Sequence, residues 1–354
     1  MSTLPSPALP DAIGIKALDA NGVASLVAEL GEPGFRAKQL VQWVYGRGAA
    51  SYAEMTNLPS GLRDRLAGRF ALAAPSVVVR QVSADGTRKY LLKLADGATI
   101  ETVGLPKDDR LTVCFSTQAG CAMGCSFCAT GESGLTRNLG PGEMVDQLHV
   151  VARDFGQRVT NAVAMGQGEP FANYEPTLGA LRLMNSPDGM GIGARHLTVS
   201  TCGLTSGIRR LSTEPEQFTL AVSLHSAVQT TRDRLMPGVK GVPLGELRQA
   251  LVDYANATGR RPSIEYALIG GVNDTPAEID ALVVFCRGLL IHVNLIPINP
   301  VEGTGYGRSA TGDIAAIERH LTAEHIEVSV RSERGADIDA ACGQLRQRST
   351  AAPE

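Results

Sequence analysis

The sequence predicts an α/β protein built on a full or partial (β/α) barrel, with a small N-terminal helical domain and a short antiparallel β segment. From residue 110 onward, short runs of β-branched and apolar residues alternate with amphipathic helical segments, which is typical of a parallel sheet covered by helices. At least six such units follow one another, and their natural closure is a full or partial barrel. A chain of 354 residues with 44% hydrophobic content is long enough for a barrel and an accessory domain.

Residues 1–75 are expected to form the helical accessory domain. Apolar periodicity, interrupted by glycine and proline, predicts helices at 23–30, 36–45, 52–56 and 62–70. The domain is locally basic beside Trp43, the only tryptophan of the chain. Such charges more often lie on a solvated helix face, and RNA binding is the alternative. The basic residues are Arg36, Lys38, Arg47, Arg63, Arg65 and Arg69.

Residues 76–109 alternate in the manner of antiparallel strands and are expected to form a β extension before the barrel. The barrel itself is expected to span 110–345, and a flexible tail 346–354. Strands of the extension are predicted at 76–81, 89–94 and 99–103. Barrel strands are predicted at 111–116, 159–165, 196–201, 218–224, 263–269, 292–298 and 326–331. Helices are predicted between them at 142–154, 175–185, 205–212, 244–257, 276–288 and 312–324.

Three cysteines follow the first barrel strand in a C-x3-C-x2-C order. Cys121, Cys125 and Cys128 place three soft thiolates in one loop, which suits an iron–sulfur cluster or zinc. A structural zinc site needs four protein ligands, and no fourth Cys or His follows at zinc-ribbon spacing. Three ligands on a four-iron cluster leave one iron open, as in the radical S-adenosylmethionine (SAM) enzymes. The aromatic residue before the last cysteine, Phe127, also matches the signature of these enzymes. Structural or disulfide-bonded cysteines are the alternative, and neither the spacing nor the absence of a secretory context favours them.

Polar residues stand at the ends of the later barrel strands, where a barrel places its chemistry. One such residue alone is usually a helix cap, and a plain turn also uses glycines. Four successive strand ends with polar groups indicate the lining of one polar ligand, and SAM needs partners for its amino group, carboxylate, ribose and adenine. The candidate binding residues are Gly168, Glu169, Ser200, Ser223, Leu224, His225 and Asn299.

In these motifs the sequence resembles the radical SAM methyltransferases that methylate an adenine carbon in large-subunit ribosomal RNA. That family comprises C2 methyltransferases, some of which also act on tRNA, and Cfr-type C8 methyltransferases. The chain departs from the usual Gly-Met-Gly-Glu-Pro pattern at Gln167, which hints at a subgroup with a different target carbon or RNA. The similarity covers nearly all of residues 30–345, with its motifs at 114–131, 168–170, 223–225, 294–300 and 337–345.

The resemblance implies a mechanism that two further cysteines carry out. Cys342 takes a methyl group from one SAM, and reductive cleavage of a second SAM produces a radical that removes a hydrogen atom from this S-methyl group. The resulting methylene radical adds to the adenine carbon. Cys114 then forms a disulfide with Cys342 and releases the product. Glu101 matches the base of the family, although from sequence alone it would pass for a surface strand residue.

The predicted activity is methylation of an adenine carbon, C2, in 23S rRNA, with tRNA as a further substrate. The cofactors implied by the resemblance are a [4Fe–4S] cluster and SAM, and the implied electron donor is of the flavodoxin or ferredoxin type. C8 methylation is the first alternative. A non-enzymatic iron–sulfur protein that binds RNA is the second, and the presence of Cys342, Cys114 and Glu101 argues against it because a sensor needs only the cluster.

Composition limits the location and the partners. The net charge of −3 does not indicate RNA binding, but a local basic patch would suffice for it. No apolar run approaches the length of a membrane span, and no signal peptide is evident at the start. Seven cysteines, an odd number, fit a reducing cytoplasm better than a disulfide framework. A cytoplasmic monomer without membrane association is expected, with Cys202 and Cys286 as buried apolar residues.

Overall fold

The computed structural model describes residues 11–132, 134–299, 304–332 and 334–340. Its contacts divide the chain into two compact units. Unit one consists of Met1–Val82, Gly86–Ala119 and Leu135–Leu197, and unit two of Ser83–Asp85, Gly120–Gly134 and Thr198–Glu354. Among the described residues, no helix is both long and apolar enough to cross a membrane.

Unit one begins with the expected helices. They are α1 (Ala20–Glu29), α2 (Phe35–Val41), which continues as a π-helical turn (Gln42–Gly46), and α3 (Ser60–Arg69). A 3-10 helix (Asp11–Ala17) precedes them and contacts α5 (Pro141–Phe155) of the same unit, because its Lys16 forms a buried ion pair of 2.5 Å with Asp146. The imidazole of His149, also on α5, contacts the backbone oxygen of Tyr45 at 2.9 Å.

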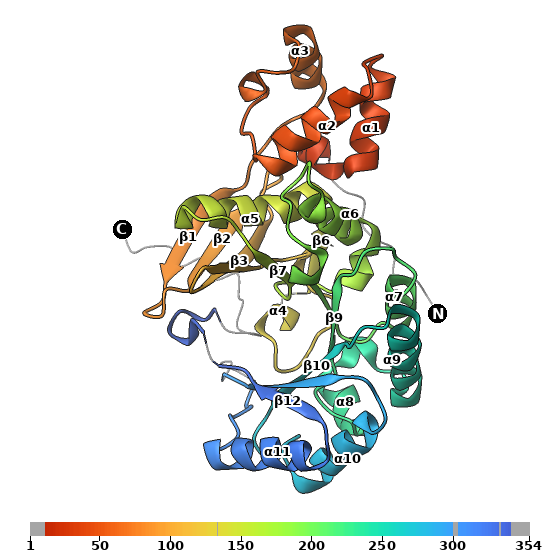
Figure 1. Ribbon diagram of the computed structural model, residues 1–354. Coiled ribbons are helices and arrows are strands. Elements are labelled where there is room, and N and C mark those ends of the chain that lie inside the picture. The colour runs from red at the N-terminus through yellow and green to blue at the C-terminus, as the bar shows by residue number, and fades with distance from the viewer. Residues whose placement is uncertain (1–10, 133, 300–303, 333, 341–354) are drawn as a thin grey trace. The chain divides into compact units, whose positions relative to one another are not determined.

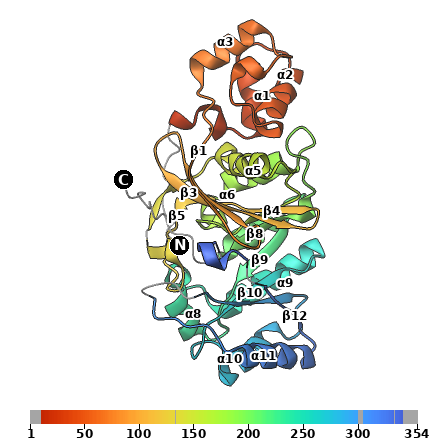
Figure 2. The same ribbon diagram turned by 90° about the vertical axis from the view of Figure 1, so that its left-hand side faces the viewer.

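The sheet of unit one joins an antiparallel meander to a parallel strand. Its strands are β1 (Ser76–Val82), β2 (Arg88–Lys93), β3 (Thr99–Lys107), β4 (Arg110–Cys114) and β7 (Asn161–Ala164), in that order. The first four pair antiparallel, and β4 pairs parallel with β7. Helices α5 and α6 (Tyr174–Asn185) lie on one face of this sheet (Figures 1 and 2). A separate two-stranded sheet pairs β5 (Gln118–Gly120) with β6 (Leu135–Asn138).

Unit two contains parallel strands separated by helices. The order β8 (Leu197–Thr201), β9 (Thr219–Ser223), β10 (Ser263–Leu268), β11 (His292–Pro297) and β12 (Glu327–Val330) follows the chain. All four neighbouring pairs are parallel, so their carboxyl ends meet at one edge. The helices are α7 (Thr205–Leu211), α8 (Gln229–Leu235), α9 (Leu244–Thr258), α10 (Pro276–Cys286) and α11 (Thr311–Ala323).

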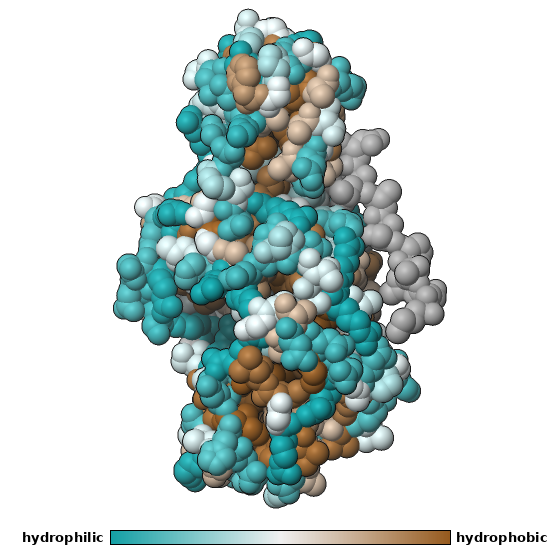
Figure 3. Space-filling view, turned by 45° about the vertical axis from the view of Figure 1, so that its right-hand side comes forward, coloured by the Kyte–Doolittle hydropathy of each residue, from teal (hydrophilic) through white to brown (hydrophobic). Residues whose placement is uncertain are grey.

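The predicted α/β class is confirmed, with strand positions within a few residues of those expected. The sequence patterns missed α8, the short α4 (Ala129–Glu132) and the β5–β6 sheet. All three are short, and α8 is polar, so they lack the periodicity that identifies longer elements. Figure 3 shows apolar residues gathered on one face of unit two, whose exposed large hydrophobic residues are Val284 and Leu290.

Candidate active site

The cysteine loop of unit two lies between β5 and α4 and contains Cys121, Cys125 and Cys128, all of them half-buried. The loop is closed by its own backbone. The amide of Cys128 donates to the carbonyl of Cys125 at 3.0 Å, and the amide of Cys121 donates to Gly134 at 2.9 Å. A side chain at Gly131 would place its Cβ 3.0 Å from the backbone of Cys125, so the following helix approaches the loop closely.

The segment after β9 anchors this loop from outside. The amide of Ser126 donates to Leu235 at 2.9 Å, and the amide of Gly238 donates to Met123 at 2.9 Å. A Cβ on Gly238 would lie 2.6 Å from the Cα of Met123, so only glycine permits this approach. Met123 also packs in an apolar cluster with Leu235 and Met236. The loop is therefore anchored to this segment by backbone hydrogen bonds and by apolar packing.

The donor set of the loop fits an iron–sulfur cluster. Among the described residues, no three Cys, His, Asp or Glu side chains are gathered so that they could hold a single metal ion. A four-iron cluster binds each cysteine through a different iron, so its ligands stand wider apart than those of one ion. Three thiols on a fixed backbone, with no disulfide among them, are compatible with that group.

His225 is held as a neutral side chain next to the cysteine loop. It follows β9 with a left-handed φ of 56°, and its ring meets Phe127 edge-on at 4.8 Å between centroids. Its Nδ1 accepts from the amide of Ala267 at 2.9 Å, which leaves the proton on Nε2. Burial, aided by the charge of Arg232, lowers the pKa of His225 to about 3. His225 can therefore donate from Nε2 but does not carry charge at neutral pH.

Arg232 on α8 is a buried cation that the sequence analysis missed. It is 1% exposed, and it donates to the carbonyls of Cys202 and Leu224 at 2.6 Å each and to Ser223 at 3.0 Å. Burial lowers its pKa, and the thiols of Cys202 and Cys125 oppose this shift. Arg232 thus ties the ends of β8 and β9 together and puts positive charge near a candidate cluster ligand. An arginine within a short polar helix gave no signal of this burial.

The remaining candidates of unit two lie at the strand ends, as expected. Ser200 is the penultimate residue of β8, and Ser223 ends β9. Leu224 follows it fully buried, with its amide donating to Glu265 at 3.0 Å. Asn299 lies two residues beyond β11 and is half-buried. Because these strands run parallel, the four residues share one edge of the unit.

In unit one, the strand register brings Glu101 and Cys114 to the same face of the sheet. Cys114 is the last residue of β4 and lies directly opposite Val103 of β3. Glu101 precedes Val103 by two residues, so its side chain leaves on the same face as the thiol. Both are buried, at 3% and 9% exposure, and Glu101 pairs with the Lys89 ammonium at 3.6 Å. From its sequence surroundings alone Glu101 would pass for a surface strand residue, but the structure buries it.

Gly168 and Glu169 follow β7 in a tightly packed turn. Gly168 has a φ of 102°, and Glu169 is 3% exposed. One carboxylate oxygen of Glu169 accepts from the amide of Phe171 at 2.9 Å and so caps the next 3-10 turn. The amide of Glu169 donates to the Gln118 side chain at 2.9 Å, which ties the turn to β5.

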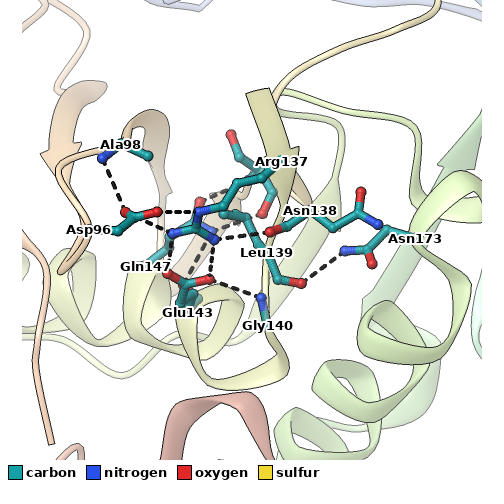
Figure 4. Close-up of polar contacts among 10 residues, drawn as sticks. Asp96, Ala98, Arg137, Asn138, Leu139, Gly140, Glu143, Gln147 and Asn173 are labelled. Atoms are coloured by element: carbon teal, nitrogen blue, oxygen red, sulfur yellow. Dashed lines mark hydrogen bonds and ion pairs between the residues drawn. The ribbon is translucent and has the colours of Figure 1, made fainter. Parts of the chain in front are cut away.

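A buried polar network around Arg137, drawn in Figure 4, reaches the Gln118 side chain that contacts this turn. Arg137 on β6 forms a two-pronged ion pair with Glu143 of α5, both bonds 2.8 Å long, and a second ion pair with Asp96 at 2.6 Å. Hydrogen bonds from Arg137 lower the pKa of Asp96. The next residue, Asn138, accepts from the Gln118 amide at 2.7 Å. The network therefore positions the side chain that holds Glu169, and no sequence pattern predicted it.

Comparison with known proteins identifies the family. The protein-family model described as "Ribosomal RNA large subunit methyltransferase N-terminal domain" matches residues 13–72 of the sequence. The family model described as "Radical SAM superfamily" matches residues 115–286. A "Probable dual-specificity RNA methyltransferase RlmN" from Pelotomaculum thermopropionicum is 45% identical over 345 residues, which cover 97% of this chain and 94% of the relative. The chain belongs to the RlmN family. A relative of the same name from Gloeobacter violaceus is 48% identical over 324 residues, which cover 91% of this chain and 92% of the relative.

A solved structure confirms the radical SAM methyltransferase fold for this RlmN-family chain. The crystal structure of a radical SAM methyltransferase from Sphaerobacter thermophilus is 46% identical, with a TM-score of 0.88 over 94% of this chain and 99% of its own. The predicted family and the predicted enzyme class, a radical SAM RNA methyltransferase, are confirmed with it. The cofactors of the superfamily are a [4Fe–4S] cluster and SAM, as predicted.

Replacing Gly168 with alanine should destabilise the turn beside Glu169. The new Cβ would lie 2.6 Å from the Cβ of Gln118 and 2.8 Å from its amide, at a φ that side chains rarely adopt. We expect a loss of at least about 2 kcal/mol in the free energy of unfolding, measured by thermal or denaturant melting. Gly97→Ala is the control, because Gly97 has a φ of 89° with nothing within 4 Å of its Cβ position. Equal losses in both variants would show that the Gln118 contact costs nothing.

Proposed function

We propose that this chain methylates carbon 2 of an adenine in 23S rRNA and in tRNA. The relatives named dual-specificity RNA methyltransferase RlmN support this choice of substrates. The observation that carries the proposal is the placement of Glu101 and Cys114, buried and on one face of the sheet, in a chain that also has the three-cysteine loop. Cys342, the proposed methyl carrier, lies outside the described residues.

In the proposed methylation each group of residues has its own role. Cys121, Cys125 and Cys128 would hold the cluster, which with SAM supplies one-electron cleavage chemistry and the methyl group. Residues at the strand ends would bind SAM: Gly168, Glu169, Ser200, Ser223, Leu224, His225 and Asn299. Cys342 accepts the methyl group on sulfur. Glu101, oriented by Lys89, takes the proton from the adenine carbon, and the thiol of Cys114 then releases the product by forming a disulfide with Cys342.

The test is the product itself. Cluster-loaded protein, SAM and a chemical reductant are incubated with a 23S rRNA fragment or with tRNA, and the nucleosides are analysed by mass spectrometry. We expect 2-methyladenosine from both RNAs and a methyl mass on Cys342 after incubation with SAM alone. Formation of 8-methyladenosine would show that the target is carbon 8 and not carbon 2. A product from only one of the two RNAs would contradict the proposal that both are substrates. A flavodoxin- or ferredoxin-type donor, a monomeric state and a cytoplasmic location complete the proposal.

The N-terminal helices carry the proposed RNA-binding surface. The guanidinium of Arg47 stacks over Trp43 at 4.3 Å, and that of Arg36 over Phe35 at 4.7 Å. Phe35 is 55% exposed, and Lys38 is exposed without an ion pair among the described residues. Aromatic and arginine planes beside free positive charge suit unstacked RNA bases and their phosphates. Arg65 and Arg69 of the predicted basic set instead pair with Glu32 and Glu29.

Replacing Lys38 and Arg47 together with glutamine should weaken RNA binding in a salt-dependent way. Each lost phosphate contact reduces counterion release, so the slope of log affinity against log salt should fall by about 1.5 for the pair. Fluorescence anisotropy with labelled RNA measures it. The control replaces Arg65 and Arg69, whose charges are already paired. Equal slopes in the wild type and the Lys38/Arg47 variant would place the RNA surface elsewhere. Deletion of the helices is a poorer test, because it would leave Asp146 buried without Lys16.

A further inference from the structure

Gln167, the residue at which this chain departs from the family pattern, is buried with an unmade hydrogen bond. It is 2% exposed, and its side-chain oxygen Oε1 has no hydrogen-bond partner. Its backbone is fully engaged: the amide donates to Ser116 Oγ at 2.9 Å, and the carbonyl accepts from Thr117 at 2.8 Å. The main chain is thus fixed, and the side chain places an oxygen without a hydrogen-bond donor in a buried position.

The surroundings leave little room for Gln167 to move away. A Cβ on Gly166 would lie 2.7 Å from the backbone of Phe115, and Gly168 is equally close to Gln118. The two glycines therefore press this turn against the segment that follows β4. A glutamine held there cannot reach solvent by a small shift of its backbone.

Two more buried oxygens beside this turn also lack partners. Thr117 Oγ1 and Asn173 Oδ1 have no hydrogen bond, and both residues are at most 2% exposed. They belong to the same local network, because the Asn173 amide donates to the Thr117 carbonyl at 2.9 Å and to Leu139, the latter bond being drawn in Figure 4. Buried polar atoms in proteins are nearly always paired, so several unmade bonds around one strand end indicate a bound group that supplies donors.

The chemistry of Gln167 defines what that group must offer. An amide oxygen accepts strongly, whereas the thioether of methionine, usual at this position in the family, accepts only weakly. Gly168 and Glu169, the next two residues, are proposed SAM-binding residues. SAM carries amino groups, and the target adenine carries one on its ring, so both proposed ligands bring N–H donors to this region. Amide side chains are suited to the amino edge of adenine.

We propose that Gln167 is a specificity-determining residue that accepts a hydrogen bond from an amino group of a bound ligand, either SAM or the target adenine. This rests on the proposed function. Gln167→Met tests it, since the two side chains are similar in length and unbranched. Removing the oxygen removes an unmade bond from the ligand-free protein, so its melting temperature should stay the same or rise. Ligand affinity should fall by about tenfold, because the amino group then loses its acceptor.

The experiment uses the anaerobic, cluster-loaded full chain and three measurements. They are the melting temperature without ligand, the affinity for S-adenosylhomocysteine by calorimetry, and the affinity for an RNA hairpin with adenine or unsubstituted purine at the target position. Gln147→Met is the matched control. The amide of Gln147 bonds both the amide and the carbonyl of Ser116, at 2.8 and 2.9 Å, so its loss should lower the melting temperature.

Each outcome decides the proposal. A tenfold loss for S-adenosylhomocysteine alone supports it with SAM as the donor. A loss of the preference for adenine over purine supports it with the RNA as the donor. Unchanged affinities overturn it, whether the melting temperature falls, as for a structural residue, or stays constant, as for a site filled by water. If the wild type binds neither ligand, the proposed function fails as well. If the wild type binds the ligands and the Gln167→Met variant binds them equally well, only this inference is overturned.

Discussion

Replacement of Cys125 by alanine should abolish the iron–sulfur cluster and, with it, all cleavage of SAM. With two thiolates left in the loop, the cluster would lose one of its three proposed protein ligands, and SAM could not substitute because it is expected at the open iron. The protein should still fold, since backbone hydrogen bonds of Ser126 and Gly238 anchor the loop and do not depend on the Cys125 side chain. Iron and sulfide analysis, electron paramagnetic resonance of the reduced protein and detection of 5′-deoxyadenosine measure the effect.

Cys286→Ala provides the control for this prediction. Cys286 is 2% exposed on α10, and burial raises the pKa of its thiol to about 12, so it is an inert apolar residue. The control should retain its full complement of iron and sulfide. A Cys125 variant with four irons per chain would show that this thiol is not a ligand. The same comparison applies to Cys121 and Cys128.

Cys114→Ala should stop the reaction with the protein covalently joined to RNA. In the proposed mechanism Cys114 acts only at the end, where it attacks the sulfur of Cys342 and releases the methylated adenine. Its backbone pairs with Val103 and Val163, and these contacts do not involve the thiol, so the sheet should survive. The adduct should resist denaturing electrophoresis and disappear on treatment with ribonuclease, while free product falls below detection.

The control for Cys114 is again Cys286→Ala, which should turn over normally. A double variant that also lacks Cys342 should form no adduct, because the attachment point is gone. Normal product formation by the Cys114 variant would show that this residue has no role in the reaction and is only part of the strand. An adduct that persists without Cys342 would assign the attachment to another residue.

Much of the fold was visible in the sequence because it depends on local patterns. In the strands at 263–268 and 292–297 polar and apolar residues alternate at first and apolar residues follow, and α9 and α10 show the apolar spacing of one buried helix face. The sequence patterns did not predict α8, and with it the buried position of Arg232 was missed. Its sequence, Gln-Thr-Thr-Arg-Asp-Arg-Leu, has no apolar periodicity, and its helical state depends on packing at Leu235 and on the burial of Arg232.

The sequence by itself determined the chemistry of the candidate site. Ligand type and count follow from Cys121, Cys125 and Cys128 at fixed spacing, and the polar strand ends follow from reading where each strand stops. Spacing within one loop is a local property, and so it is readable without a structure. The resemblance added the proposed roles of Cys342, Cys114 and Glu101, which no spacing could have supplied.

Only the tertiary structure decided which distant residues lie close together. The sharing of one sheet face by Glu101 and Cys114 depends on the register between β3 and β4, since a slip of one residue would reverse the side chains. The unmade hydrogen bond of Gln167 and the buried charge of Arg232 depend on what packs around them. Register and burial arise from contacts between segments far apart in the chain, and a local pattern of residues does not contain them.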